Sequence, residues 1–206
     1  MRARPLLLFA LLAIAAAHLL DPVAFRYLRV DDIYGSDWGR FLRIQGFLPL
    51  WLVAGVALVL HDGDWGRSIL RGRGGLLMAG TTLGGAAAEL LKLVFRRLRP
   101  GDLGEYVFRP FTDRPFSSAG LALPSSHALV AFGAAAVLAR LFPRARWVWL
   151  SLAWGCGLSR VAAGAHFLSD VVVAAVVGWG VGALVWRWRW EPTSSTAAQR
   201  PVPSSG

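Results

Sequence analysis

The sequence is short of cysteine, lysine and charge, and each shortage excludes a class of protein. One cysteine, Cys156, in 206 residues excludes a disulfide framework and any metal site built from several cysteines. Only 17% of the residues are charged and 55% are hydrophobic, too much apolar content for a soluble domain or a disordered chain. The formal charge of +10 comes from arginines that punctuate apolar runs and form no basic stripe, which argues against nucleic acid as a partner. The composition therefore predicts an integral membrane protein, with the lipid bilayer as its surroundings.

Six apolar runs approach the length of a membrane helix, which needs about 20 mostly apolar residues. They cover residues 5–20, 47–60, 75–95, 127–142, 147–163 and 168–188, and the second is short unless it begins near Phe41. Gly80 with Gly84, and Gly178 with Gly182, have the small-xxx-small spacing of closely packed membrane helices. The predicted fold class is all-α, an integral membrane bundle of six transmembrane helices in one domain, residues 1–190.

The connecting segments differ in character. Residues 21–46 mix aromatic, basic and acidic side chains, and we expect them to lie partly along the membrane interface. Residues 96–126 form the longest link, and loops of that length are usually functional. Residues 191–206 are rich in Ser, Thr and Pro, which predicts a disordered tail. An alternative reading of the first run, which follows Arg2 and Arg4, is a cleaved signal peptide.

Polar residues gather at one end of the predicted bundle, because successive helices run in opposite directions across a bilayer. The end of the third run, the start of the fourth, the end of the fifth and the start of the sixth share this end. They contribute Lys92, Arg99, Ser125, Ser126, His127, Ser159, Arg160, His166 and Asp170. Ionisable residues in or near membrane spans are costly and are functional candidates by default.

The cations in this set suit a phosphate. Lys92, the only lysine of the chain, joins Arg99 and Arg160 in a group that matches a dianionic phosphate. Lys92 and Arg99 are two helical turns apart if the helix continues that far, and Pro100 limits it at about Arg99. Whether Arg96, Arg97, Arg109 and Arg114 contact a head group or are ordinary interfacial charges is left open by the sequence.

The remaining polar residues supply an anion site and acid–base chemistry. Ser125 and Ser126 open an apolar run, so they sit at a helix N-terminus whose free N–H groups favour anions. His166 and Asp170 are four residues apart, so the carboxylate can fix the imidazole tautomer and stabilise its cationic form. His127 is available as a general acid for a leaving oxygen. No carboxylate or cysteine cluster is present to hold a metal, and no cofactor is expected.

Three motifs carry a family resemblance. They are Lys92-x6-Arg99-Pro100, then Pro124-Ser125-Ser126-His127, then Ser159-Arg160-x5-His166-x3-Asp170. Together they resemble the three-part signature of the type 2 phosphatidic acid phosphatases. The first and third motifs match in every fixed position. The second has Ser126 where the family usually has Gly, and the Ser126 N–H can still donate although its side chain fills space that a Gly leaves open.

The resemblance implies a metal-independent phosphatase that cleaves a lipid phosphate or diphosphate through a phosphohistidine. His166 would attack phosphorus, oriented by Asp170, while His127 would protonate the leaving group and then serve the attacking water. Lys92, Arg99, Ser125, the Ser126 backbone and Arg160 would hold the phosphate oxygens. Undecaprenyl diphosphate, phosphatidylglycerophosphate, phosphatidate and the lipid A 1-phosphate all stay open as substrates.

Other functions are compatible with parts of this pattern. A lipid phosphotransferase that uses the same phosphohistidine is the main alternative. Haloperoxidases carry the same motifs around vanadate but are soluble, and an intact His, His and Asp set argues against a non-enzymatic scaffold. The distribution of basic residues, once the three site cations are set aside, favours cytoplasmic N- and C-termini. The large excess of arginine over lysine is typical of a GC-rich bacterial genome. The chain is therefore expected in the bacterial plasma (inner) membrane, with the site facing the periplasm or exterior.

Overall fold

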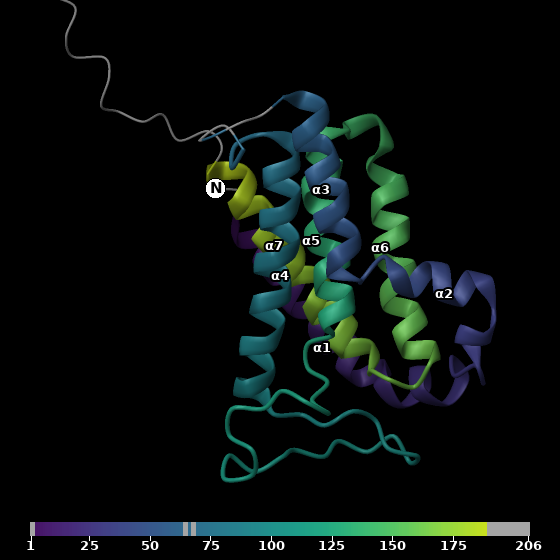
Figure 1. Ribbon diagram of the computed structural model, residues 1–206. Helices are drawn as coiled ribbons and strands as arrows, with labels where there is room; N and C mark the ends of the chain where they lie inside the picture. Colours follow the sequence, from purple (N-terminus) through teal and green to yellow (C-terminus); the bar gives the residue numbers. More distant parts are fainter. Residues whose placement is uncertain (1–2, 64–65, 67–68, 189–206) are drawn as a thin grey trace, which may run out of the picture.

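The computed structural model describes residues 3–63, 66 and 69–188, so the predicted tail at 191–206 lies outside the described residues. Within those ranges the chain is all-helical (Figure 1). Its helices are α1 (Ala3–Tyr27), η1 (Ile33–Gly35), α2 (Asp37–Ile44), α3 (Leu48–Asp62), α4 (Arg73–Phe95), α5 (Ser126–Leu141), η3 (Pro143–Ala145), α6 (Arg146–Ala162) and α7 (Leu168–Trp188). The predicted all-α fold class is confirmed, and a long helix lies at each of the six predicted runs.

Helix length and composition support fewer membrane spans than the six that the sequence predicted. Among the described residues, three helices are long and apolar enough to cross a bilayer, at Arg4–Tyr27, Arg73–Phe95 and Leu168–Trp188. The pair Asp37–Ile44 and Leu48–Asp62 passes the same test together but is bent by 64°, which makes up to four. Helix α5, with 16 residues, is shorter than the usual span of about 17–25.

Helix α5 is the centre of the bundle, with α4, α6 and α7 packed around it (Figure 1). Every residue from Ala128 to Leu138 is buried, and most of them are small. A Cβ added at Gly80 of α4 would lie 2.7 Å from Val137, and one at Gly178 of α7 would lie 2.8 Å from the Leu129 carbonyl oxygen. These glycines therefore set the close helix contacts that the small-xxx-small spacing predicted.

The segment after the first predicted run is more helical than expected. Helix α1 continues through Asp21 and Pro22 to Tyr27, where the sequence predicted an end near Leu20. The Asp21 carboxylate is buried, and it accepts hydrogen bonds from the backbone N–H and the hydroxyl of Ser169 at the start of α7. After η1, the short helix α2 leads into α3 and exposes Trp38 and Phe41, as expected of an interfacial segment.

The link from α4 to α5 is an ordered loop across one end of the bundle (Figure 1). Arg96 takes a left-handed conformation, with φ 55°, and ends α4 at Phe95. Its guanidinium donates to the carbonyl oxygens of Arg109, Pro110, Asp113 and Pro115. Arg109 in turn donates to the carbonyl oxygens of Ser117 and Ala119. Arg96 and Arg109 therefore hold this loop together from within.

Candidate active site

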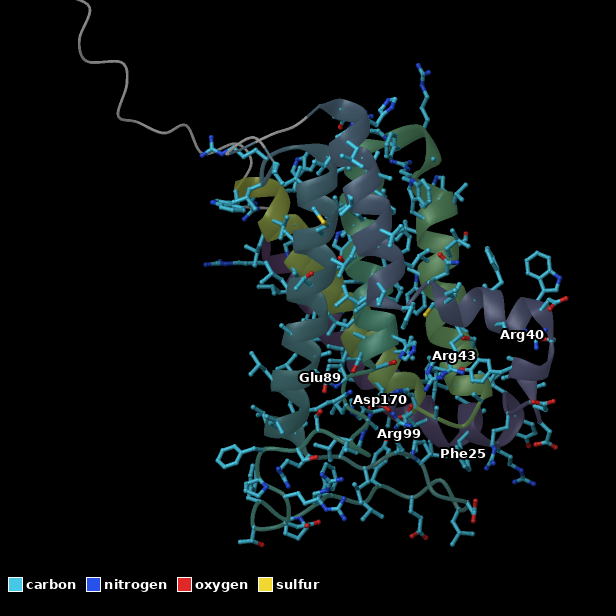
Figure 2. All side chains as sticks on the ribbon, viewed as in Figure 1. Phe25, Arg40, Arg43, Glu89, Arg99 and Asp170 are labelled. Carbon is cyan, nitrogen blue, oxygen red and sulfur yellow. The ribbon has the colours of Figure 1, made fainter. Side chains whose placement is uncertain are left out.

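Four helix ends bring most of the predicted site residues to one end of the bundle. Lys92 comes from the last turn of α4, Ser126 and His127 from the first turn of α5, Arg160 from the last turn of α6, and Asp170 from the first turn of α7. Figure 2 labels Glu89, Arg99 and Asp170 close together at this end, beside the α4–α5 link. The convergence predicted from alternating helix direction is thus present in the fold.

His166 and Asp170 form a buried pair. The Nδ1 atom of His166 lies 3.4 Å from Oδ2 of Asp170, and each side chain is at most 2% exposed. The same Oδ2 accepts a hydrogen bond of 2.8 Å from the Phe167 backbone, which fixes the carboxylate at the start of α7. Burial lowers the pKa of His166, in the loop before α7, against the opposing pull of Asp170. A lowered pKa leaves the imidazole unprotonated, as a nucleophile must be.

Arg97 is a site residue that the motifs did not identify. Its Nη2 lies 2.5 Å from Oδ1 of Asp170 and also donates to the Ser169 hydroxyl at 2.7 Å. The guanidinium stacks on the rings of Tyr106 and Phe167 and is almost fully buried. Arg97 is therefore neither a head-group contact nor an interfacial charge. Its position two residues after the end of α4 gave no sequence signal for a partner 73 residues away.

Glu89 is a second site residue that the motifs did not identify, and it contacts both Lys92 and Ser126. The Lys92 ammonium lies 3.0 Å from Oε1 of Glu89 and donates to the Ser126 hydroxyl, which itself donates to that Oε1 at 2.6 Å. Ser118 of the link donates to the other carboxylate oxygen. Glu89 lies one turn before Lys92, and that spacing was the available signal. The side chain of Ser126, where the family usually has Gly, thus joins a lysine to a carboxylate.

Ser125 acts in the structure as the N-cap of α5. Its hydroxyl oxygen accepts from the Ala128 backbone at 3.5 Å, and its own backbone N–H donates to the Asp170 carbonyl oxygen at 3.2 Å. The side chain is fully buried. The hydroxyl proton is left as the group that Ser125 can offer to a phosphate.

Arg160 is held by a residue outside the motifs, Tyr34 of η1. Arg160 Nη1 donates to the Tyr34 hydroxyl at 2.7 Å, and that hydroxyl donates to the Ser159 carbonyl oxygen at 3.1 Å. The Arg160 side chain is 6% exposed, and its Nε has no hydrogen-bond partner within the described residues. A buried guanidinium with an open donor is arranged to receive an anion.

Arg99 reaches this end of the bundle from the link and not from a helix. Because α4 ends at Phe95, the helix does not continue to Arg99, and the two-turn spacing that depended on this continuation does not apply. The Arg99 backbone donates to the Gly120 carbonyl oxygen at 3.1 Å, so the link itself positions this residue, and the side chain is exposed. His127 is partly buried and lines a cavity with Arg43 and Phe47.

A metal site has no support among the described residues, where no group of three or more His, Cys, Asp or Glu side chains could hold an ion. His61 and Asp62 lie at the end of α3, and Asp62 pairs with Arg73. Metal independence itself is not tested by this observation and stays a prediction.

Comparison with known proteins matches the motif region to one family. The family model of the PAP2 superfamily matches residues 73–194. Lipid A 1-phosphatases of Rhizobium etli and Rhizobium johnstonii are 32% and 31% identical over 142 and 143 residues, which is 62% of this chain in both cases. The alignments cover 60% and 57% of those relatives, so the chain spans less than two thirds of their length.

A solved structure shares the fold. It is a transmembrane PAP2-type phosphatidylglycerolphosphate phosphatase from Bacillus subtilis, with a TM-score of 0.60 at 20% identity. The superposition covers 89% of this chain and 94% of that one. The likeness extends over nearly all of both chains, including helices outside the motif region.

Proposed function

Because the chain belongs to the PAP2 superfamily, a family of lipid phosphatases, we propose that it hydrolyses a lipid phosphate through a phosphohistidine on His166. The observation that carries the proposal is the buried His166–Asp170 pair, 3.4 Å apart, at the end of the bundle where Lys92 and Arg160 converge. A neutral, oriented imidazole beside several cations is what attack on a phosphate requires.

In the proposed first step, His166 bonds to phosphorus through Nε2 while Nδ1 faces Asp170. The carboxylate holds the tautomer that leaves Nε2 free and stabilises the positive charge that develops on the ring. Lys92, Arg99 and Arg160 bind the phosphate oxygens, and their charges stabilise the five-coordinate phosphorus. The Ser125 hydroxyl and the Ser126 backbone N–H are further donors at the N-terminus of α5.

His127 is proposed as the acid and base of the reaction. It gives a proton to the oxygen that leaves phosphorus and then takes one from the water that attacks the phosphohistidine. The second step returns His166 and releases inorganic phosphate. No residue of the proposed set needs a metal ion for either step.

Hydrolysis is preferred over phosphate transfer because the relatives and the solved neighbour are named phosphatases. The chain is a multi-pass membrane protein, and we place it in the bacterial plasma membrane with its termini in the cytoplasm. The site then faces the periplasm or exterior, where it meets head groups of the outer leaflet.

The test is phosphate release by purified protein in detergent from a panel of lipid phosphates, with and without an acceptor lipid. We expect release that survives EDTA, is inhibited by vanadate and is abolished in His166→Ala. His61→Ala, at the far end of α3, is the matched control and should keep full activity. Magnesium-dependent release, or transfer to the acceptor without free phosphate, would contradict the proposal.

A further inference from the structure

Two cavities open beside the proposed catalytic residues, and Arg43 of α2 lines both. The first, of about 260 Å³, is also lined by Tyr34 and Arg160. The second, of about 300 Å³, is also lined by Ile44, Phe47 and His127. Figure 2 shows Arg43 on the part of α2 nearer Asp170 and Arg99, with Arg40 farther out. Arg43 therefore lies at the point where the space around His127 meets the space around Arg160.

Most buried or loop arginines of this end already have partners in the protein, and Arg43 differs from them. Arg97 pairs with Asp170, and Arg96 donates to four carbonyl oxygens. Arg40, one turn before Arg43, pairs with Asp37 at 2.5 Å. Arg43 is exposed, and within the described residues its guanidinium has neither an ion pair nor a hydrogen bond, while it stacks at 4.9 Å from the centre of the Tyr34 ring.

Tyr34 places Arg43 next to Arg160. The Arg160 guanidinium lies 5.6 Å from the centre of the same ring and donates to its hydroxyl. Both cations line the 260 Å³ cavity, and the buried Nε of Arg160 has no partner in the described part of the chain. Asp32 also lines this cavity, so the two guanidiniums leave it with a net positive charge, which suits anionic oxygens beyond those of a single phosphate.

The position of Arg43 relative to His127 indicates which part of the substrate Arg43 contacts. If His127 protonates the leaving oxygen, the group that follows this oxygen lies in the cavity that His127 shares with Arg43. Ile44 and Phe47 form apolar walls of that cavity, suited to the first carbons of a lipid. We propose that Arg43 is a substrate-binding residue that holds a second phosphate, carried by the leaving group of a lipid substrate. The inference rests on the proposed phosphatase function.

The chemistry differs with the leaving group. In a lipid diphosphate, His166 bonds to the terminal phosphorus as the bond to the bridging oxygen breaks, and the electron pair stays on that oxygen. The lipid monophosphate that leaves carries the added negative charge, and Arg43 stabilises it. In a lipid whose second phosphate is a phosphodiester a few carbons away, the leaving alkoxide takes a proton from His127 while Arg43 holds the phosphodiester. In both cases water then releases inorganic phosphate from His166.

The experiment compares three substrates of matched chain length: a polyprenyl diphosphate, phosphatidylglycerophosphate and phosphatidate, which has a single phosphate. In Arg43→Gln we expect kcat/KM for a substrate with a second phosphate to fall by about 10- to 100-fold relative to phosphatidate, mostly through KM. Arg43→Lys should recover part of this ratio because it keeps the charge and loses the planar fork. Arg146→Gln is the matched control, since Arg146 stacks on Trp147 at 4.9 Å near the other end of α6, and its ratio should stay that of wild type.

The outcomes distinguish the two sources of the second phosphate, and they distinguish failure of the Arg43 role from failure of the proposed phosphatase function. A fall confined to the diphosphate, or confined to phosphatidylglycerophosphate, supports the inference and identifies the source. An equal fall on all three substrates, or no change, overturns it, because Arg43 would then act only through Tyr34 and Arg160 or not at all. Thermal unfolding of each variant, followed by tryptophan fluorescence, identifies a misfolded one. Wild-type protein that hydrolyses none of the three refutes the proposed function itself.

Discussion

Arg97 and Asp170 form a buried ion pair across the candidate site, with Nη2 of the guanidinium 2.5 Å from Oδ1 of the carboxylate. The pair joins the α4–α5 link to the first turn of α7. Because Asp170 uses its other oxygen to face His166, Arg97 fixes the residue that orients the proposed nucleophile. Arg97 is thus a positioning residue, and its loss should affect stability and activity together.

We predict that Arg97→Met lowers the free energy of unfolding by about 3–5 kcal/mol, because it leaves the Asp170 carboxylate buried without its cation. Phosphatase activity should fall with it. The measurement is thermal unfolding in detergent beside phosphate release. Arg114→Gln is the matched control, since Arg114 lies 3.6 Å from Asp113 in an exposed pair of little value. Equal stability of the two variants would show that the buried pair contributes nothing.

The motif residues were predictable because hydropathy and alternating helix direction are enough to bring four helix ends together. The point where α4 ends and the α4–α5 link begins was not predictable. Arg96 ends α4 in a left-handed conformation that usually calls for Gly, so no stop signal could be recognised in the sequence before Pro100. Tyr34 lies in a mixed segment without periodicity, and its bond to Arg160 spans 126 residues. Such contacts depend on tertiary packing, which local sequence patterns do not encode.

The Glu89 carboxylate accepts from the Lys92 ammonium, which a phosphate would also use, and from the Ser126 hydroxyl beside it. We therefore predict that Glu89→Gln tightens inhibition by vanadate about 3- to 10-fold, because an anionic inhibitor no longer competes with this carboxylate for Lys92. Inhibition curves at fixed substrate measure the effect. Glu105→Gln, an exposed carboxylate of the same link, should leave the inhibition constant unchanged. Weaker inhibition of Glu89→Gln would mean that Glu89 holds Lys92 in its binding position.

The proposed orientation places the α4–α5 link outside the cell. A cysteine introduced at Glu105 should react in intact cells with a reagent that does not cross the membrane, and one introduced at Arg144 in η3 should not. Cys156 is fully buried, so the wild-type chain provides a low background. If the bacterium has an outer membrane, spheroplasts replace whole cells. Labelling at Arg144 and not at Glu105 would reverse the orientation and the leaflet that supplies the substrate.

The two histidines should fail in different ways, because they have different proposed tasks. His166→Ala removes the nucleophile, so turnover of every substrate should be lost alike. His127→Ala removes the proton donor for the leaving oxygen, a contribution of about 10²–10⁴-fold where the leaving group is a lipid alkoxide. A substrate whose leaving group is an acidic phenol hardly needs that proton. His127→Ala should therefore still form a phosphoenzyme from an aryl phosphate while it fails on a lipid monoester.

The phosphoenzyme itself separates the roles further. In His127→Ala it should persist, since the water that hydrolyses it has lost its base, and a pulse of labelled aryl phosphate followed by acid quench measures it. The bound phosphate should be acid-labile, as a phosphohistidine is, and absent from the double variant that also carries His166→Ala. Equal losses in the two single variants on both substrates would mean that His127 binds phosphate and transfers no proton. A labelled intermediate that survives in His166→Ala would place the nucleophile on another residue.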